Sequence, residues 1–160
     1  MIEMELIGVR VELPTNNPIV LLKETTGRGR VLPIFIGGPE ATAIALALDG
    51  VETPRPMTHD LLVTLLGELG ARLERIVVTD LQEGTFFADL HLQTPTGPKV
   101  VSSRPSDAIA LAVRVGAPLF AEEHVVDEAA APVEEEDERE EVVEEFRRFI
   151  DTVDPEDFAS

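Results

Sequence analysis

The chain has no cysteine, no tryptophan and no tyrosine, and only three of its 160 residues are histidine. Without cysteine it can form neither a disulfide nor a thiolate metal site. No apolar run approaches the roughly 20 residues that span a bilayer. The N-terminal Met1–Glu5 lacks the basic and apolar regions of a signal peptide. We therefore expect a cytoplasmic protein that has no membrane partner.

Basic residues are scarce as well. The chain has 13 Lys and Arg against 31 Asp and Glu, a net charge of −18, of which residues 1–127 carry −7 and residues 128–160 carry −11. Contacts from Lys and Arg to phosphate dominate nucleic-acid binding. An acidic chain that handles DNA or RNA therefore needs a local arginine patch, bound metal ions, or both. The seven Phe lie mostly in apolar stretches, so we expect little aromatic surface for stacking bases.

Signature motifs of common enzyme classes are also missing. The sequence contains no G-x-S-x-G elbow, no Walker loop, no dinucleotide-binding fingerprint and no H-E-x-x-H zinc motif. These absences leave polar residues at the ends of secondary-structure elements as the candidates for chemistry.

The apolar pattern up to residue 127 predicts an α+β domain. We expect a mostly antiparallel or mixed sheet of about six strands packed with three helices. Strands are predicted at 4–12, 19–23, 30–36, 72–79, 85–94 and 99–102. Helices are predicted at 41–48, from 58 to about 70, and from Arg104-Pro105 to about 115. Pro33 cannot donate to a sheet ladder, so its strand is expected at an edge. We expect residues 122–127 to form an exposed closing segment.

The composition changes after residue 127. Residues 128–140 form an acidic linker, and residues 141–160 carry an amphipathic acidic helix with its apolar side chains on one face (Val142, Val143, Phe146, Phe149 and Ile150). This C-terminal helix can dock on its own domain, on another subunit or on a protein partner.

One short phrase occurs twice. Arg55-Pro56 and Arg104-Pro105 each precede small polar and acidic residues and then a helix-like apolar run. Proline suits the first position of a helix, Thr58 is a candidate N-cap, and Asp60 and Asp107 fall in first turns, where the helix dipole favours negative charge. Such helix starts can bind a phosphate or place a carboxylate on a metal. The same residues are also common helix-capping and first-turn residues with no role in binding, and both interpretations stay open.

Convergence of these helix starts would create a chemical site. Glu40 opens the first predicted helix, and Glu40, Asp60 and Asp107 together would suit Mg²⁺ or Mn²⁺. Such ions would assist phosphodiester hydrolysis. Arg55 and Arg104 would then hold the phosphate. The first-turn position of His59 disfavours a charged imidazole and leans towards a neutral ligand or base.

At these residues the chain resembles the bifunctional nuclease domain family of bacteria and plants. The resemblance covers about residues 3–127 and is carried by five stretches: 32–37 with Glu40-Ala41, 55–62, 85–88, 103–112 and 116–120. It implies a compact α+β fold, nuclease activity on DNA and RNA with little sequence preference, and self-association, for which we favour a dimer. The acidic tail resembles C-terminal extensions of actinobacterial relatives.

The polar positions matched by the resemblance are our candidate site. They are Glu40, His59, Asp60 and Asp107 as catalytic residues, Arg55, Thr58, Arg104 and Ser106 as substrate-binding residues, and Glu40, Asp60 and Asp107 as metal ligands. Two alternatives remain. In the first alternative, the chain is a non-catalytic regulatory module that binds an anion or a partner's acidic group. In the second, it is a structural homo-oligomer whose helix caps only hold the fold.

Overall fold

A computed structural model describes residues 1–12 and 16–131 of the chain, so the predicted tail helix and all of the predicted linker except residues 128–131 lie outside the described residues. The described strands are β1 (Ile2–Glu12), β2 (Asn17–Glu24), β3 (Val31–Phe35), β4 (Arg72–Gln82), β5 (Thr85–Thr94), β6 (Gly97–Ser103) and β7 (Leu119–Ala121). The described helices are α1 (Gly38–Leu48), α2 (Thr58–Glu68), α3 (Pro105–Val115) and α4 (Glu123–Ala129). This α+β architecture confirms the predicted fold class.

The described strands form one mixed sheet in the order β3-β2-β1-β7-β4-β5-β6. The β4–β7 pair is parallel, and the other neighbouring pairs are antiparallel. Pro33 lies in β3, at one edge of the sheet, as predicted from its missing N–H. The three-residue β7 joins the β1–β2–β3 half to the β4–β5–β6 half.

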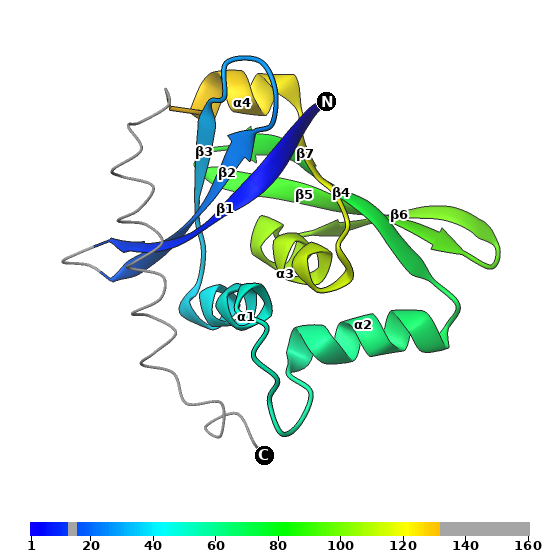
Figure 1. The fold of residues 1–160 in the computed structure, drawn as a ribbon. Helices are drawn as coiled ribbons and strands as arrows, with labels where there is room; N and C mark the ends of the chain where they lie inside the picture. Colours follow the sequence, from blue (N-terminus) through cyan, green and yellow to red (C-terminus); the bar gives the residue numbers. More distant parts are fainter. Residues whose placement is uncertain (13–15, 132–160) are drawn as a thin grey trace.

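The sheet curves strongly. α4 packs against both β3 and β4, although β2, β1 and β7 lie between those two strands in the sheet order. Val31 of β3 also exchanges backbone hydrogen bonds with Ala131, just after α4. In Figure 1, α4 covers the top of the sheet, while α1, α2 and α3 lie together in the lower half.

Small side chains allow α1 and α3 to pack closely. Both helices bury alanines, including Ala41 and Ala45 in α1 and Ala108 and Ala112 in α3, and α3 contacts α1, α2, β4 and β5. α2 packs mainly on α3 and leaves leucines exposed on its outer face. The core therefore fixes the N-termini of α1 and α3 next to each other and places the N-terminus of α2 beside them.

Two sequence predictions are wrong in detail. Residues 122–127 are not an exposed segment, because α4 begins at Glu123 and fully buries Val125 and Val126. Thr58 is not the N-cap of α2 but its first helical residue. The carboxylate of Asp60 accepts a hydrogen bond from the Met57 backbone N–H at 2.9 Å, and so caps the helix from inside its first turn.

Candidate functional site

The first three helices each carry an acid at the third helical position. These acids are Glu40 in α1, Asp60 in α2 and Asp107 in α3. A carboxylate in the first turn is stabilised by the positive end of the helix dipole, so the sequence places an acid at each helix start. Gly37 leaves room for the Glu40 side chain, since a Cβ at Gly37 would collide with the Glu40 carboxylate.

Four of the predicted residues form one polar cluster, which we call the Arg104 cluster: Glu40, His59, Arg104 and Asp107. Arg104 donates from Nε to Asp107 Oδ2 at 2.8 Å and from Nη2 to Asp107 Oδ1 at 3.1 Å. The same guanidinium pairs with Glu40 Oε1 at 3.0 Å. His59 Nε2 lies 2.9 Å from Asp107 Oδ1.

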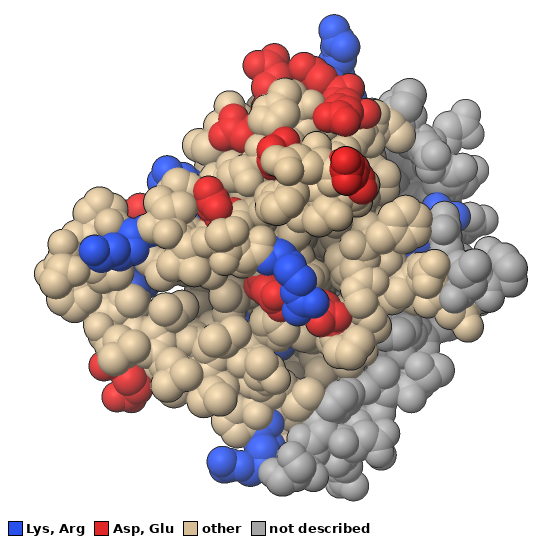
Figure 2. All heavy atoms as spheres, turned by 180° about the vertical axis from the view of Figure 1, so that it is seen from behind, with Lys and Arg blue, Asp and Glu red and all other residues tan. Residues whose placement is uncertain are grey.

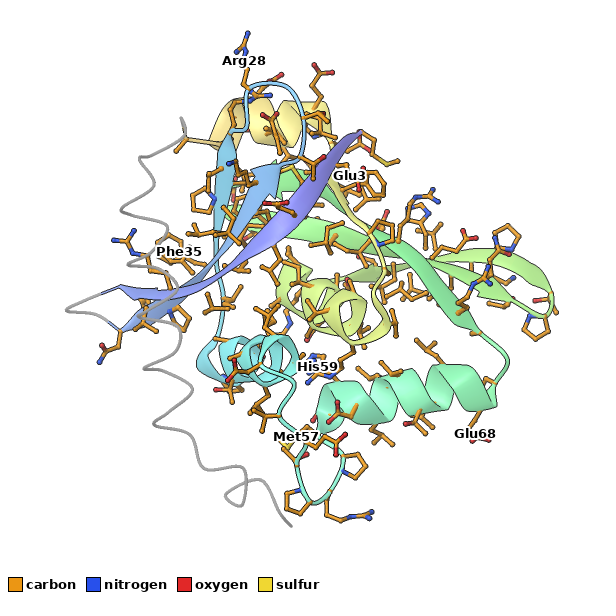
Figure 3. The ribbon with its side chains drawn as sticks, viewed as in Figure 1. Glu3, Arg28, Phe35, Met57, His59 and Glu68 are labelled. Carbon is orange, nitrogen blue, oxygen red and sulfur yellow. The ribbon has the colours of Figure 1, made fainter. Side chains whose placement is uncertain are left out.

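The members of the Arg104 cluster differ in their access to solvent. The Arg104 side chain is 63% exposed and that of Asp107 is 26% exposed, whereas His59 is buried. Figure 3 shows His59 among α1, α2 and α3, inside the region where these helices meet. Arg104 and Asp107 can therefore reach a ligand, and His59 supports Asp107 from behind.

Asp60 belongs to a different contact. Its Oδ1 accepts a hydrogen bond from Arg114 Nε at 2.7 Å. Arg114 also donates to the carbonyl oxygens of Ala110 at 2.8 Å and Ala43 at 3.0 Å. One guanidinium, on a side chain that is 9% exposed, thus ties the first turn of α2 to α1 and α3.

Asp107 and Asp60 are both held in the charged form. Burial alone would raise the pKa of Asp107, but hydrogen bonds from Arg104 and His59 outweigh burial and lower that pKa. Burial would also raise the pKa of Asp60. The hydrogen bonds from Arg114 and from the Met57 backbone outweigh burial, and they lower that pKa. Asp107 above all, and also Glu40, raise the pKa of Arg104.

Of the three carboxylates predicted as metal ligands, Glu40 and Asp107 share the Arg104 cluster, and Asp60 stands apart from them. Within residues 1–12 and 16–131, no three His, Cys, Asp or Glu side chains are arranged to hold a metal ion. These carboxylates form ion pairs with arginines instead. Arg104 pairs with Glu40 and Asp107, and Arg114 pairs with Asp60. The donor set as it stands does not fit a bound Mg²⁺, which prefers near-ideal octahedral oxygen coordination.

The remaining candidates occupy different places. Arg55 is exposed in the loop before α2, and Thr58 is exposed at the start of that helix, and neither makes any of the contacts of the Arg104 cluster. Ser106 is buried in the first turn of α3 and lines the cavity beside Arg104. The structure therefore joins Ser106, but not Arg55 or Thr58, to the region of the cluster.

A cavity of about 500 Å³ opens beside Arg104. Its walls come from the start of β2, the end of β3, the β4–β5 turn and the start of α3, and its lining includes Asn17, Phe35, Gly37, Thr85, Phe86, Arg104 and Ser106. Strands from both halves of the curved sheet thus meet around it. This volume lies within the range of small-molecule sites.

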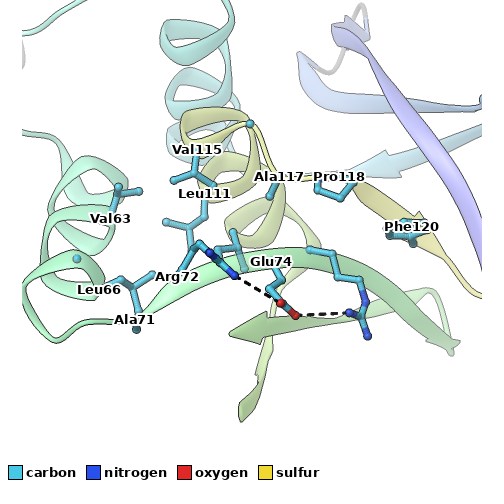
Figure 4. A pocket seen from close by; sticks show the side chains of 14 residues that line it. Val63, Leu66, Ala71, Arg72, Glu74, Leu111, Val115, Ala117, Pro118 and Phe120 are labelled. Carbon is cyan, nitrogen blue, oxygen red and sulfur yellow. Dashed lines mark ion pairs between the residues drawn. The ribbon is translucent and has the colours of Figure 1, made fainter. Parts of the chain in front are cut away.

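A second cavity, of about 680 Å³, lies between α2, the end of α3 and β4. Its lining is largely apolar, and its charged residues pair with one another, Arg72 with Glu74 and Arg75 with Glu74, both at 3.8 Å (Figure 4). None of the predicted site residues lines it. The polar chemistry of the described residues therefore concentrates at the first cavity.

The charged side chains on the surface agree with the expectation that any basic site is local. On the face shown in Figure 2, a basic side chain near the middle is flanked by acidic side chains, and no broad basic surface is visible there. Among the described residues, no helix is long and apolar enough to cross a membrane.

Sequence reasoning missed three residues of this region. Arg114 follows Asp107 by seven positions, a spacing that places both on one face of α3, and this was an available signal. Phe86 lies within a stretch that carries the family resemblance. Phe35 is 64% exposed at the end of β3, and it too lies within a stretch that carries the family resemblance.

Comparison with known proteins places the chain in a family. The model of the bifunctional nuclease domain matches residues 20–134, and the chain belongs to this family. Two proteins of Mycobacterium tuberculosis strains, both named only as uncharacterised, are 47% identical over 163 residues, which cover 98% of this chain and 97% of theirs.

Two plant proteins match a shorter part. Bifunctional nuclease 1 of Arabidopsis thaliana is 29% identical over 106 residues, which are 64% of this chain and 33% of that protein. Bifunctional nuclease 2 of the same plant is 29% identical over 104 residues, 62% of this chain and 31% of its own length. This chain therefore matches about a third of each plant nuclease.

Proposed function

We propose that the Arg104 cluster hydrolyses phosphodiester bonds of DNA and RNA with little sequence preference. The observation that carries the proposal is the partly exposed Asp107, held between His59 and the exposed guanidinium of Arg104, which itself lines a cavity. An exposed arginine can hold a phosphate by two parallel hydrogen bonds. Membership of the bifunctional nuclease domain family supports the same reaction class.

Binding of a phosphate would change the state of Asp107. In the free protein Arg104 pairs with Asp107 and Glu40, and these contacts hold the Asp107 carboxylate ionised. A substrate phosphate would compete for the guanidinium of Arg104. As that contact weakens, the pKa of Asp107 rises and the carboxylate becomes a better proton acceptor.

The hydrolytic step follows from this change. A water oxygen adds to phosphorus, and its proton passes to Asp107, which His59 Nε2 keeps oriented. The phosphorus–oxygen bond opposite the water breaks, the leaving oxygen takes up a proton from solvent, and Asp107 then releases its proton to solvent. Glu40 keeps Arg104 at the cavity mouth when Asp107 is engaged with water.

No step of this proposal passes through a metal ion. Mg²⁺ or Mn²⁺ dependence, with Glu40, Asp60 and Asp107 as ligands, stays a prediction, because the arginines hold those carboxylates in the described residues. Asp60 is assigned here to positioning, and Arg55 and Thr58 remain candidates for contacts to a longer substrate.

The test is cleavage of labelled single-stranded and double-stranded DNA and RNA by highly purified full-length protein. Each reaction is run with Mg²⁺, with Mn²⁺ and with EDTA, beside Arg104→Met and His59→Gln variants purified identically and checked for folding. We expect cleavage by the wild type and a loss of at least about 100-fold in both variants. Cleavage retained in both variants would place the reaction elsewhere or in a contaminant, and cleavage abolished by EDTA would establish the metal.

A second candidate function has one specific observation in its favour. Arg104 already has two carboxylate partners in the free protein, which suits a module that exchanges them for an external anion without chemistry. Binding of the labelled strands with no cleavage under any metal condition would favour this regulatory function. Self-association and a partner for residues 141–160 remain predictions, and sedimentation of the full chain tests the first of them.

A further inference from the structure

The cavity beside Arg104 has an unusual wall for so acidic a protein. Phe35 is 64% exposed at the end of the edge strand β3, although burying a phenyl ring normally stabilises a fold. Phe86, on β5, lines the same cavity and packs partly against the core. Two aromatic rings and a guanidinium therefore border one space, and Figure 3 shows Phe35 standing at the outer edge of the sheet.

The other walls suit a flat ring with polar edges. Gly37 and Gly84 contribute no side chain, so the backbone forms part of the lining. Asn17, Thr85 and Ser106 supply amide and hydroxyl groups at the border of the same space. Such groups donate and accept hydrogen bonds without a requirement for one particular base.

From these contacts we propose that the cavity receives a single unpaired base of the substrate, with Phe35 as the stacking platform and Arg104 on the phosphate next to that base. This inference rests on the proposed nuclease function and narrows its substrate class to single-stranded DNA or RNA. A base in a duplex must first leave its stack, at a cost of a few kcal/mol. An unpaired base enters without that cost, and stacking on an aromatic ring tolerates any base.

Charge favours the same occupant. The described part of the chain is acidic overall, and Arg104 is the basic residue that lines this cavity. A duplex presents a dense row of phosphates, which needs several Lys or Arg contacts. A base that binds through its apolar face adds affinity without further positive charge, so single-stranded binding needs fewer basic residues.

The test measures binding separately from cleavage. Full-length protein is titrated into a labelled ten-nucleotide phosphorothioate strand, which resists hydrolysis, and anisotropy is recorded. The same titration uses the matching duplex and a strand of abasic residues with the same number of phosphates. Phe35→Ala and Phe35→Trp are compared with Phe87→Ala, a matched control on β5 that is 38% exposed and does not line the cavity.

We expect Phe35→Ala to weaken single-stranded binding by about 5- to 150-fold, the range of one base–aromatic stack. Phe35→Trp is expected to retain binding, and Phe87→Ala to change it by less than about twofold. The duplex and the abasic strand should bind the wild type as weakly as the single strand binds Phe35→Ala.

Three results would overturn the inference: equal effects of Phe35→Ala and Phe87→Ala, equal binding of the duplex and the single strand, or no binding of any strand by the wild type. The proposed nuclease function fails separately. Binding that depends on Phe35, without cleavage of an ordinary phosphodiester strand, would refute hydrolysis and keep the base site. Cleavage that is unchanged by Phe35→Ala would refute the base site and keep the proposed hydrolysis.

Discussion

At the scale of single residues, two arginines divide the acidic helix starts between two tasks. Arg104 is exposed, lines a cavity and pairs with Glu40 and Asp107, so that a ligand in the cavity can compete for its guanidinium. The Arg114 side chain is only 9% exposed and holds Asp60 together with two backbone carbonyls. An exposed guanidinium can take part in binding. A guanidinium that is 9% exposed and has three acceptors mainly positions the helices, although its partner Asp60 is 40% exposed.

Replacing Arg114 with Met should therefore destabilise the fold. The substitution keeps most of the side-chain volume but removes three hydrogen bonds, and it leaves the buried carbonyls of Ala43 and Ala110 without this donor. We expect a loss of roughly 2 to 3 kcal/mol in the free energy of unfolding, measured by urea denaturation. Arg72→Met is the control, because Arg72 is exposed and reaches Glu74 only at 3.8 Å, and it should change stability by less than about 0.5 kcal/mol. Equal effects of the two substitutions would contradict the role of Arg114.

At the scale of elements, the site depends on how three helices meet. The alanine-rich faces of α1 and α3 bring Glu40 and Arg104 within 3.0 Å of each other. Packing of α2 on α3 brings His59 to Asp107. The helix starts therefore converge because of contacts made further along each helix.

This dependence marks the limit of sequence reasoning. The repeated Arg-Pro phrase correctly located the starts of α2 and α3, and with them His59, Arg104 and Asp107. The same pattern suggested that Asp60 joins Glu40 and Asp107. Asp60 instead reaches Arg114, near the opposite end of α3. Sequence periodicity reports the face of a helix but not which neighbour that face meets.

The same limit explains α4. Its seven residues are too few for a helical period to stand out, and its acidic side chains favoured an exposed segment. Only the curved sheet provides the surface that buries Val125 and Val126. Arg30 adds a polar contact there, because it bridges Glu24 and Asp127 at 2.8 Å from each.

Truncation of the buried face of α4 tests its part in the fold. Val125→Ala and Val126→Ala each remove two buried methyl groups and leave a cavity, since both side chains are fully buried. We expect each to lower the free energy of unfolding by about 1 to 3 kcal/mol. Glu128→Ala, on the exposed side of the same helix, should stay within about 0.5 kcal/mol. Wild-type stability in both valine variants would show that α4 does not pack as described.

At the scale of the whole molecule, the excess of acidic residues shapes both stability and substrate choice. Three ionised carboxylates, Glu24, Asp60 and Asp107, have lowered pKa values because arginine partners bind their charged forms. In the unfolded chain these groups return to ordinary values of about 4. The unfolded state therefore binds more protons than the folded state in the acid range.

The sign of the pH dependence follows from this difference. The stability that the lowered pKa values contribute is fully present above about pH 4 to 5, and it is lost as pH falls through the folded-state pKa values. We expect the urea midpoint to fall steadily from pH 5 towards pH 3. Asp60→Asn removes one of the titrating groups and should flatten this fall. A variant whose midpoint falls as steeply as that of the wild type would show that Asp60 does not contribute.

The most direct measurement compares Asp107→Asn with Asp60→Asn in kcat/KM on one labelled single-stranded substrate. Both substitutions remove one carboxylate charge from the third position of a helix, and both proteins are checked for folding at the assay temperature. We expect Asp107→Asn to lose at least about 100-fold in kcat/KM, because it removes the proton acceptor, and Asp60→Asn to lose less than about tenfold. A loss in Asp60→Asn equal to or greater than that in Asp107→Asn would contradict the placement of the reaction at the Arg104 cluster.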